Sequence, residues 1–286
     1  MQSMLKQQLY LTGAGLALFF GFFLFGKIET QKSNFPHSDS TAIFNINNFI
    51  QKARQKLPAS KREYISKIEN NISRGDVKGQ LYHQYLELAG FWKDSAKSFV
   101  PYSYYLSEAS KLDNSEKNLT FAARLILDSM RNEEDVATKS WEAETAAILF
   151  EKAIKLNPAD DELKVGLGSC YVYGKGMIGD AAETMKGIQQ LLQVVKKDSA
   201  NMKAQMVLGI GGVISRQYIK AIDRLSKVVL VEPSNLEAVS WLADAYAGKG
   251  DTQGSIRWYE YSKKLVNNNQ YSKEVDERIK ALNAQH

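Results

Sequence analysis

The sequence contains few of the residues that build disulfides, metal sites or catalytic triads. It has one cysteine, Cys170, and three widely separated histidines, His37, His83 and His286. A single thiol forms no internal disulfide, and no cysteine or histidine lies at metal-site spacing. Cys170 lies in an apolar stretch, where we expect a packed thiol rather than a reactive one. We therefore expect no enzyme, no catalytic residues, no metal and no cofactor.

Proline is also scarce, and neither charge sign forms a long block. Five prolines in 286 residues, with abundant alanine, leucine, lysine, glutamate and glutamine, favour helix over sheet. The net charge of +5 is spread along the chain, which argues against nucleic acid as a partner. A chain of this length can bury a substantial core.

Long apolar runs are missing except at the N-terminus. Between Lys6 and Lys27 lie 20 uncharged residues, which as a helix would be about 30 Å long, enough to cross a bilayer. No small-x-small cleavage site follows the run, which disfavours a cleaved signal peptide. A buried core helix is the other alternative. The pattern favours an uncleaved membrane anchor over residues 1–26.

Lysine counts leave the orientation of this anchor open. Lys6 and the terminal amine on one side are nearly balanced by Lys27 and Lys32 on the other. A short N-terminal head is typical of a signal-anchor, which places the following domain outside the cytoplasm. We therefore expect a single-pass protein of the inner membrane with a periplasmic or extracytoplasmic domain.

Small residues recur at a spacing of four in the predicted anchor. Gly13, Ala17 and Gly21 share one helix face, and this spacing lets two membrane helices approach closely. A homodimer through this face is one interpretation. The other is that small residues are simply common in membrane helices.

After the anchor, residues 27–44 are polar and carry turn signals, so we expect a linker. Residues 45–78 hold two stretches with apolar residues at helical spacing. Pro58 and Ser60 mark the start of the second stretch. These residues are predicted to form an N-terminal helical hairpin.

Further along, the chain resembles itself. One set of proline, leucine and tyrosine recurs with the same two intervals: Pro158, Leu167 and Tyr171, then Pro233, Leu242 and Tyr246. Leu208 lies 34 residues before Leu242 and takes the place of the leucine in another copy of this set. A small residue followed four positions later by a bulky one also recurs: Ala146 and Phe150, Gly187 and Leu191, Ala221 and Leu225, Ser255 and Tyr259.

A period of 34 residues is the signature of the tetratricopeptide family, and the chain resembles that family. The resemblance implies an all-α, right-handed α-α superhelix of about five helix hairpins over residues 80–270. The best repeats cover 142–266, and residues 271–286 would form a capping helix. Gly212 and Ser199 depart from the aromatic and proline positions of the pattern. Upstream of 142 the match is weaker, and we expect an extended loop over 131–140.

The resemblance also implies a partner-binding groove lined by the first helix of each hairpin. Its register places these residues in the groove: Val165, Ser169, Tyr173, Met206, Ile210, Val213, Ser240 and Asp244. Positions that hold a lysine and asparagine carboxylate clamp in some members carry Val165, Ser169, Met206 and Val207, so that clamp is absent. The alternative for the apolar members is packed core. The expected function is a membrane-anchored scaffold for a protein or peptide, or a self-associating subunit of an envelope biogenesis or secretion complex.

Three glycines, Gly174, Gly176 and Gly179, form a literal G-x-G-x-x-G. In a dinucleotide site this motif follows a strand and opens a helix whose amides hold pyrophosphate. Here the preceding stretch is a helix by repeat register. We therefore expect an enlarged turn inside one hairpin rather than a nucleotide site, and its use as a contact loop stays open.

Overall fold

The computed structural model describes residues 44–74, 78–177, 180–266 and 268–284. The predicted anchor at 1–26, its small-residue face at Gly13, Ala17 and Gly21, and most of the predicted linker lie outside these ranges. Within them, none of the helices combines the length and the apolar character that a bilayer span needs. The same ranges hold thirteen α-helices and no strand, which confirms the predicted all-α class.

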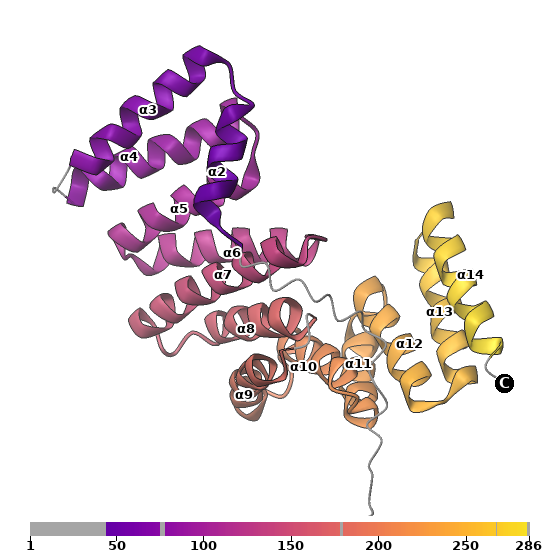
Figure 1. The fold of residues 1–286 in the computed structure, drawn as a ribbon. Coiled ribbons are helices and arrows are strands. Elements are labelled where there is room, and N and C mark those ends of the chain that lie inside the picture. The colour runs from indigo at the N-terminus through magenta and orange to yellow at the C-terminus, as the bar shows by residue number, and fades with distance from the viewer. Residues whose placement is uncertain (1–43, 75–77, 178–179, 267, 285–286) are drawn as a thin grey trace, which may run out of the picture. The chain divides into compact units, whose positions relative to one another are not determined.

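The helices follow one another with short connections (Figure 1). They are α2 (Ile46–Gln55), α3 (Ala59–Arg74), α4 (Lys78–Gly90), α5 (Phe99–Asp113), α6 (Glu116–Arg131), α7 (Val136–Leu156), α8 (Asp161–Ser169), α9 (Ala181–Lys197), α10 (Met202–Ile214), α11 (Tyr218–Val231), α12 (Leu236–Lys249), α13 (Thr252–Leu265) and α14 (Asn269–Asn283). Two π-helical segments continue α4 and α8: η1 (Phe91–Ser95) and η2 (Cys170–Gly176).

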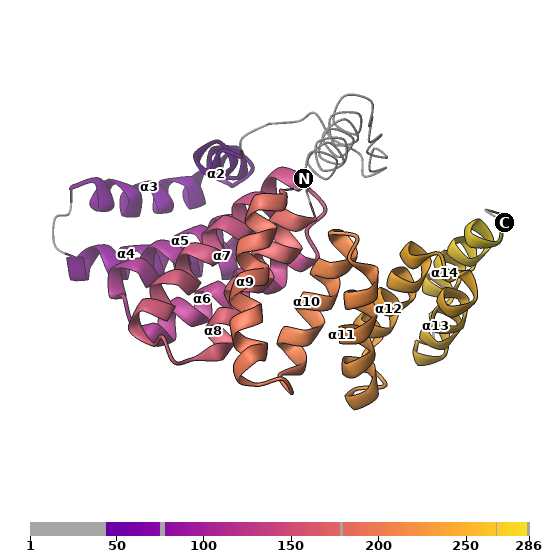
Figure 2. The same ribbon diagram turned by 90° about the horizontal axis from the view of Figure 1, so that it is seen from below.

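Consecutive helices pair into hairpins: α4 with α5, α6 with α7, α8 and η2 with α9, α10 with α11, and α12 with α13. The first helices of the last four hairpins also contact one another in succession. Helix α6 contacts α8 and η2, α8 and η2 contact α10, and α10 contacts α12. We call these four the first-helix layer. Helix α14 packs on α13, and Figure 2 shows the hairpins side by side in chain order. The right-handed course of the superhelix stays a prediction.

Side-chain caps set where most helices begin. An aspartate, asparagine or serine before the first turn accepts a hydrogen bond from a backbone N–H in nine helices, through Asn45, Ser115, Asp135, Asp160, Asp180, Asn201, Asn235, Asp251 and Asn268. Each such cap contributes about 0.5–2 kcal/mol. The short connections are therefore encoded locally, one polar residue per helix start.

Glycines in the first helices let the bulky repeat residues pack closely. A Cβ built on Gly168 would lie 2.5 Å from Cγ of Leu191, and one on Gly209 would lie 2.6 Å from Cγ of Leu225. Both leucines are fully buried. In both contacts the bulky member of a predicted pair, on the second helix, fills the space beside a glycine of the first helix.

The extended loop expected over 131–140 is wrong. Helix α6 runs to Arg131 and α7 already begins at Val136. The Asp135 carboxylate accepts a hydrogen bond from the Thr138 amide at 2.8 Å, which starts α7 after a connection of only four residues. The extra residues of this repeat therefore lengthen α7 to 21 residues instead of forming a loop.

The turn expected at the glycine motif is also wrong for Gly174 and Gly176, while Gly179 lies outside the described residues. Both lie in η2, which continues α8, so the predicted helix before them is confirmed. A Cβ on Gly174 would come closer to the Ala143 Cβ than the 3.0 Å below which such contacts do not occur. These glycines serve helix packing. At the start of η2, Cys170 is buried as predicted, and burial raises the pKa of its thiol.

Candidate partner-binding site

Four residues expected to be exposed in the groove are buried instead: Val165, Ser169, Tyr173 and Ile210. The reason is the close approach of successive first helices. A Cβ on Gly211 of α10 would already be in van der Waals contact with Val172 of η2, at 3.6 Å. Side chains between helices this close form one hydrophobic core. The packed-core alternative is correct at these positions.

The remaining predicted groove residues are only partly accessible. Met206 and Val213 are half-buried against the same core, and the Met206 sulfur lies 3.7 Å from the Asn235 amide nitrogen. Their apolar atoms therefore belong mainly to packing between α10 and its neighbours, with one edge left to solvent.

Ser240 and Asp244 are held by the C-terminal helices. The hydroxyls of Ser240 and Tyr271 lie 2.9 Å apart. The Asp244 carboxylate accepts hydrogen bonds from Tyr259 and, at 3.2 Å, from Arg278 of α14. Burial raises the pKa of Asp244, and these two donors oppose that rise. The acid expected at the end of the groove thus fastens α14 to the repeats.

A polar and aromatic pocket of about 500 Å³ opens on the first-helix layer. It is lined by residues of α6, α7, η2 and α12 and the segments beside them: Asp128, Arg131, Asn132, Lys139, Tyr173, Met177, Glu237 and Trp241. We call it the first-helix pocket. Of the predicted site residues, only Tyr173 contributes to it.

One wall of this pocket is a fixed cluster of three side chains. The Arg131 guanidinium stacks over the Tyr173 ring, 4.8 Å from its centroid, and forms an ion pair with Glu237. The Tyr173 hydroxyl donates a hydrogen bond to the other Glu237 oxygen at 3.0 Å. Burial and the Glu237 charge raise the pKa of this hydroxyl, so it stays protonated and keeps donating. The cluster joins α6 to α12 across 106 residues of sequence.

Other groups of the pocket are available to a ligand. The Lys139 ammonium and the Asp128 carboxylate form no hydrogen bond or salt bridge within the described ranges, and the Asn132 amide nitrogen bonds only the Asp128 carbonyl oxygen, at 3.3 Å. Trp241 and Met177 add apolar surface. The pocket therefore offers a cation, an anion and an amide beside an aromatic ring, a set that matches the backbone and side chains of a peptide.

Sequence reasoning missed most of these residues for two reasons. Arg131 and Lys139 fall at the ends of the segment that was expected to be a loop. Glu237 and Trp241 precede the predicted Ser240 and Asp244 by three residues each, so they share the same broad face of α12. A predicted face of α12 that also included the positions three residues before Ser240 and Asp244 would have contained both.

Comparison with known proteins bears on the fold alone. No protein-family model and no curated protein matches the sequence. Solved structures with similar architecture include MamA from Desulfovibrio magneticus RS-1, with 16% identity, a TM-score of 0.47, and coverage of 67% of this chain and 96% of that one. The predicted tetratricopeptide-type fold agrees with the consecutive helix hairpins of the described residues, and the comparison adds no argument of its own.

Two further neighbours are described as tetratricopeptide proteins. YrrB, described as having an unusual peptide-binding site, is 13% identical with a TM-score of 0.45, and the match covers 73% of this chain and 97% of that one. A thermophilic protein from Thermus thermophilus is 13% identical with a TM-score of 0.49, and the match covers 72% and 98%. At these values the similarity concerns the repeat architecture and carries nothing about what this chain binds.

Proposed function

We propose that this protein is a non-enzymatic scaffold that binds a peptide segment of a partner protein in the first-helix pocket. One observation supports this most: Lys139 and Asp128, neither of which forms a hydrogen bond or salt bridge in the described ranges, face the same pocket as Trp241. Available charges of opposite sign beside an aromatic ring suit an extended peptide, whose carboxylate, amide and apolar groups can each find a complement.

The rigid wall of the pocket favours tight binding. Arg131, Tyr173 and Glu237 hold one another in place before any partner arrives. Preorganised walls reduce the entropy lost when a peptide binds. We infer that this cluster shapes the pocket, while Lys139 and Asp128 form the polar contacts that orient the peptide.

Selection of peptides against the full chain tests this assignment. Short peptides selected from a random library are expected to lose at least about tenfold in affinity for Lys139→Glu and Trp241→Ala. Lys117→Glu is a matched control, since Lys117 is an exposed lysine near the start of the preceding helix, α6. Equal affinity of the selected peptides for wild type, Lys139→Glu and Trp241→Ala would show that they bind elsewhere.

The scaffold is further proposed to act at a membrane. The apolar run within residues 1–26 supports an anchor and polar residues 27–44 support a linker, with the repeats on the periplasmic or extracytoplasmic side. Deleting residues 1–27 is expected to move the protein from the membrane fraction to the soluble fraction. Protease added to intact and then permeabilised cells tests the side: cleavage only after permeabilisation of the inner membrane would contradict the orientation.

A second candidate function is a self-associating subunit of an envelope biogenesis or secretion complex. The spacing of Gly13, Ala17 and Gly21 favours it. A dimer formed through this face is expected to dissociate when the small residues are enlarged by Gly13→Leu and Gly21→Leu. A dimer that survives deletion of residues 1–27 would instead place self-association in the repeats.

A further inference from the structure

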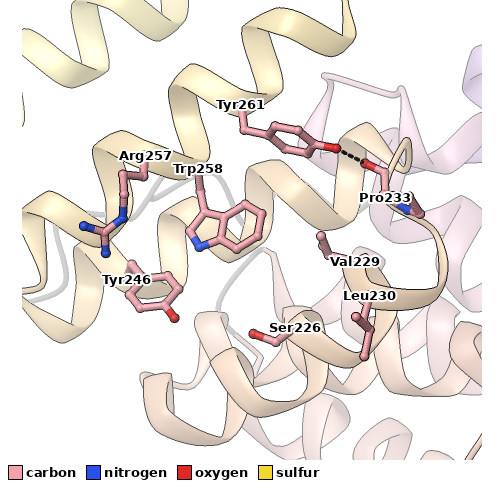
Figure 3. A pocket seen from close by; sticks show the side chains of 8 residues that line it. All are labelled: Ser226, Val229, Leu230, Pro233, Tyr246, Arg257, Trp258 and Tyr261. Atoms are coloured by element: carbon pink, nitrogen blue, oxygen red, sulfur yellow. Dashed lines mark hydrogen bonds between the residues drawn. The ribbon is translucent and has the colours of Figure 1, made fainter.

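A second pocket, of about 660 Å³, lies between α11, α12 and α13 (Figure 3). It is lined by Ser226, Val229, Leu230, Pro233, Tyr246, Arg257, Trp258 and Tyr261. We call it the α11–α13 groove. In Figure 3 the indole of Trp258 stands in the middle, with Arg257 and Tyr246 on one side and Val229 and Leu230 on the other.

The aromatic wall of this groove is already fixed. The Tyr261 hydroxyl donates a hydrogen bond to the Pro233 carbonyl oxygen at 3.2 Å, shown dashed in Figure 3. The rings of Trp258 and Tyr261 meet edge to face, with centroids 5.9 Å apart. The hydrogen bond joins α13 to the connection before α12, so this wall is held in place before a ligand binds.

Helix α11 presents unusually exposed apolar side chains beside this wall. Leu230 is 83% exposed, Ile219 75% and Val231 60%, the three highest values among the large apolar side chains that the structure describes. Ser226 and Leu230 lie seven and eleven positions after Ile219, so the three share one face of α11 over about 16 Å. Large apolar side chains this exposed on one helix are typical of an interaction surface.

Among the described residues that line the groove, Arg257 is the one charged side chain. Arg257 forms no hydrogen bond or salt bridge with any described residue. Three acids on α11, at its C-terminal end and on α13 already have partners: Asp223 with Lys227 at 2.8 Å, Glu232 with Asn235 at 2.8 Å, and Glu260 with Lys263 at 3.4 Å. A carboxylate on an occupant is the natural complement of this side chain, because a planar guanidinium pairs well with carboxylates.

We propose that the α11–α13 groove binds an acidic amphipathic helix of a partner protein. The partner's leucine-type side chains would contact Leu230, Trp258 and Ile219, and a glutamate or aspartate beside them would pair with Arg257. A stripe of about 16 Å matches about three turns of an α-helix, long enough for the i, i+3, i+4 and i+7 anchors of a helix-in-groove contact.

This groove is separate from the first-helix pocket. Helix α12 contributes Glu237 to the pocket and Tyr246 to the groove. These residues are nine positions apart, so at about 100° per residue they project from opposite sides of the helix. One scaffold can therefore hold two segments at once.

The test uses the full chain in nanodiscs and a fluorescein-labelled designed helix of about 16 residues, with leucines at helical spacing and glutamates between them. Fluorescence anisotropy compares it with a version carrying lysine for glutamate and one carrying serine for leucine. Empty nanodiscs are the blank. We expect the acidic peptide to bind at least about tenfold more tightly than either of the others.

Variants of the groove sharpen the test. Arg257→Glu is expected to weaken the acidic peptide at least about tenfold and to make the lysine version the better ligand. Leu230→Ser is expected to weaken the acidic peptide without changing the charge preference. Arg62→Glu, at an exposed arginine of α3, is the matched control, and Lys139→Glu in the first-helix pocket should leave the anisotropy unchanged.

Three results would overturn the proposal. The first is equal binding of acidic and basic peptides, or binding of neither below about 1 mM. The second is an acidic preference that survives Arg257→Glu while circular dichroism shows intact helices. The third is dissociation of a dimer of the full chain by Leu230→Ser, which would identify the occupant as a second copy. Loss of binding in the first-helix pocket alone would leave this proposal standing.

Discussion

Replacing Gly174 by alanine tests whether this glycine is needed for close helix packing or for the flexibility of a turn. Gly174 is buried in η2, and a Cβ built there would lie 3.0 Å from the Met130 sulfur and closer still to the Ala143 Cβ. The sulfur is at the end of a flexible side chain, but the Cβ of Ala143 moves only with its backbone. The new methyl group must therefore push η2 and α7 apart.

The two opposing effects can be compared in magnitude. Alanine is favoured over glycine in a helix interior by about 0.8–1.0 kcal/mol. Overpacking a close helix contact costs about 1–3 kcal/mol. We therefore expect Gly174→Ala to lower the free energy of unfolding by up to about 2 kcal/mol, which corresponds to a fall of several degrees in Tm at about 2–4 °C per kcal/mol.

Urea denaturation followed by circular dichroism measures the change. Gly79→Ala in α4 is the matched control, because a Cβ there meets nothing within 4 Å and the substitution should stabilise. The double variant with Ala143→Gly restores the space and should recover part of the loss, giving a non-zero coupling energy. Stabilisation by Gly174→Ala equal to that by Gly79→Ala would refute the packing role.

Three further predictions concern buried and clustered groups. Burial raises the pKa of Glu142 to about 7, although a hydrogen bond from the Ser129 hydroxyl opposes the rise. Between about pH 5 and 8 the folded state therefore holds a proton that the unfolded state has lost. The free energy of unfolding should fall by about 1–3 kcal/mol over that pH range. Glu142→Gln should flatten this profile in urea titrations, and an equally steep profile in the variant would assign the decline to other groups. Arg131→Ala and Glu237→Ala should show a coupling of about 1 kcal/mol in a thermal double-mutant cycle, whereas additive losses would mean that the ion pair contributes nothing. The buried Cys170 thiol should react with a thiol reagent in urea but not in the native protein, and fast native labelling would contradict its burial.

The repeat pattern predicted the helices well because its signals are local. Capping residues such as Asp160 and Asn235 mark helix starts, and the Gly168 and Leu191 positions recur with the period. The same pattern predicts which face of a helix turns toward the next repeat. It carries no measure of how close the next helix comes.

That missing distance explains the errors at the site. Val165 and Ile210 lie on the predicted face, yet small residues such as Gly211 bring the helices close enough to bury them. The pairing of Arg131 with Glu237 spans 106 residues and has no local sequence signal. Exposure within the layer depends on the separation of helices, which only the folded structure shows.

Hydrogen exchange of the full chain, with and without a peptide selected for binding to it, tests the central claim most directly. Binding in the first-helix pocket is expected to protect amides in the last turn of α6, the first turns of α7 and the first turns of α12, with no comparable change in α2 or α3. Strong binding without protection in those three segments would contradict the pocket as the partner-binding site.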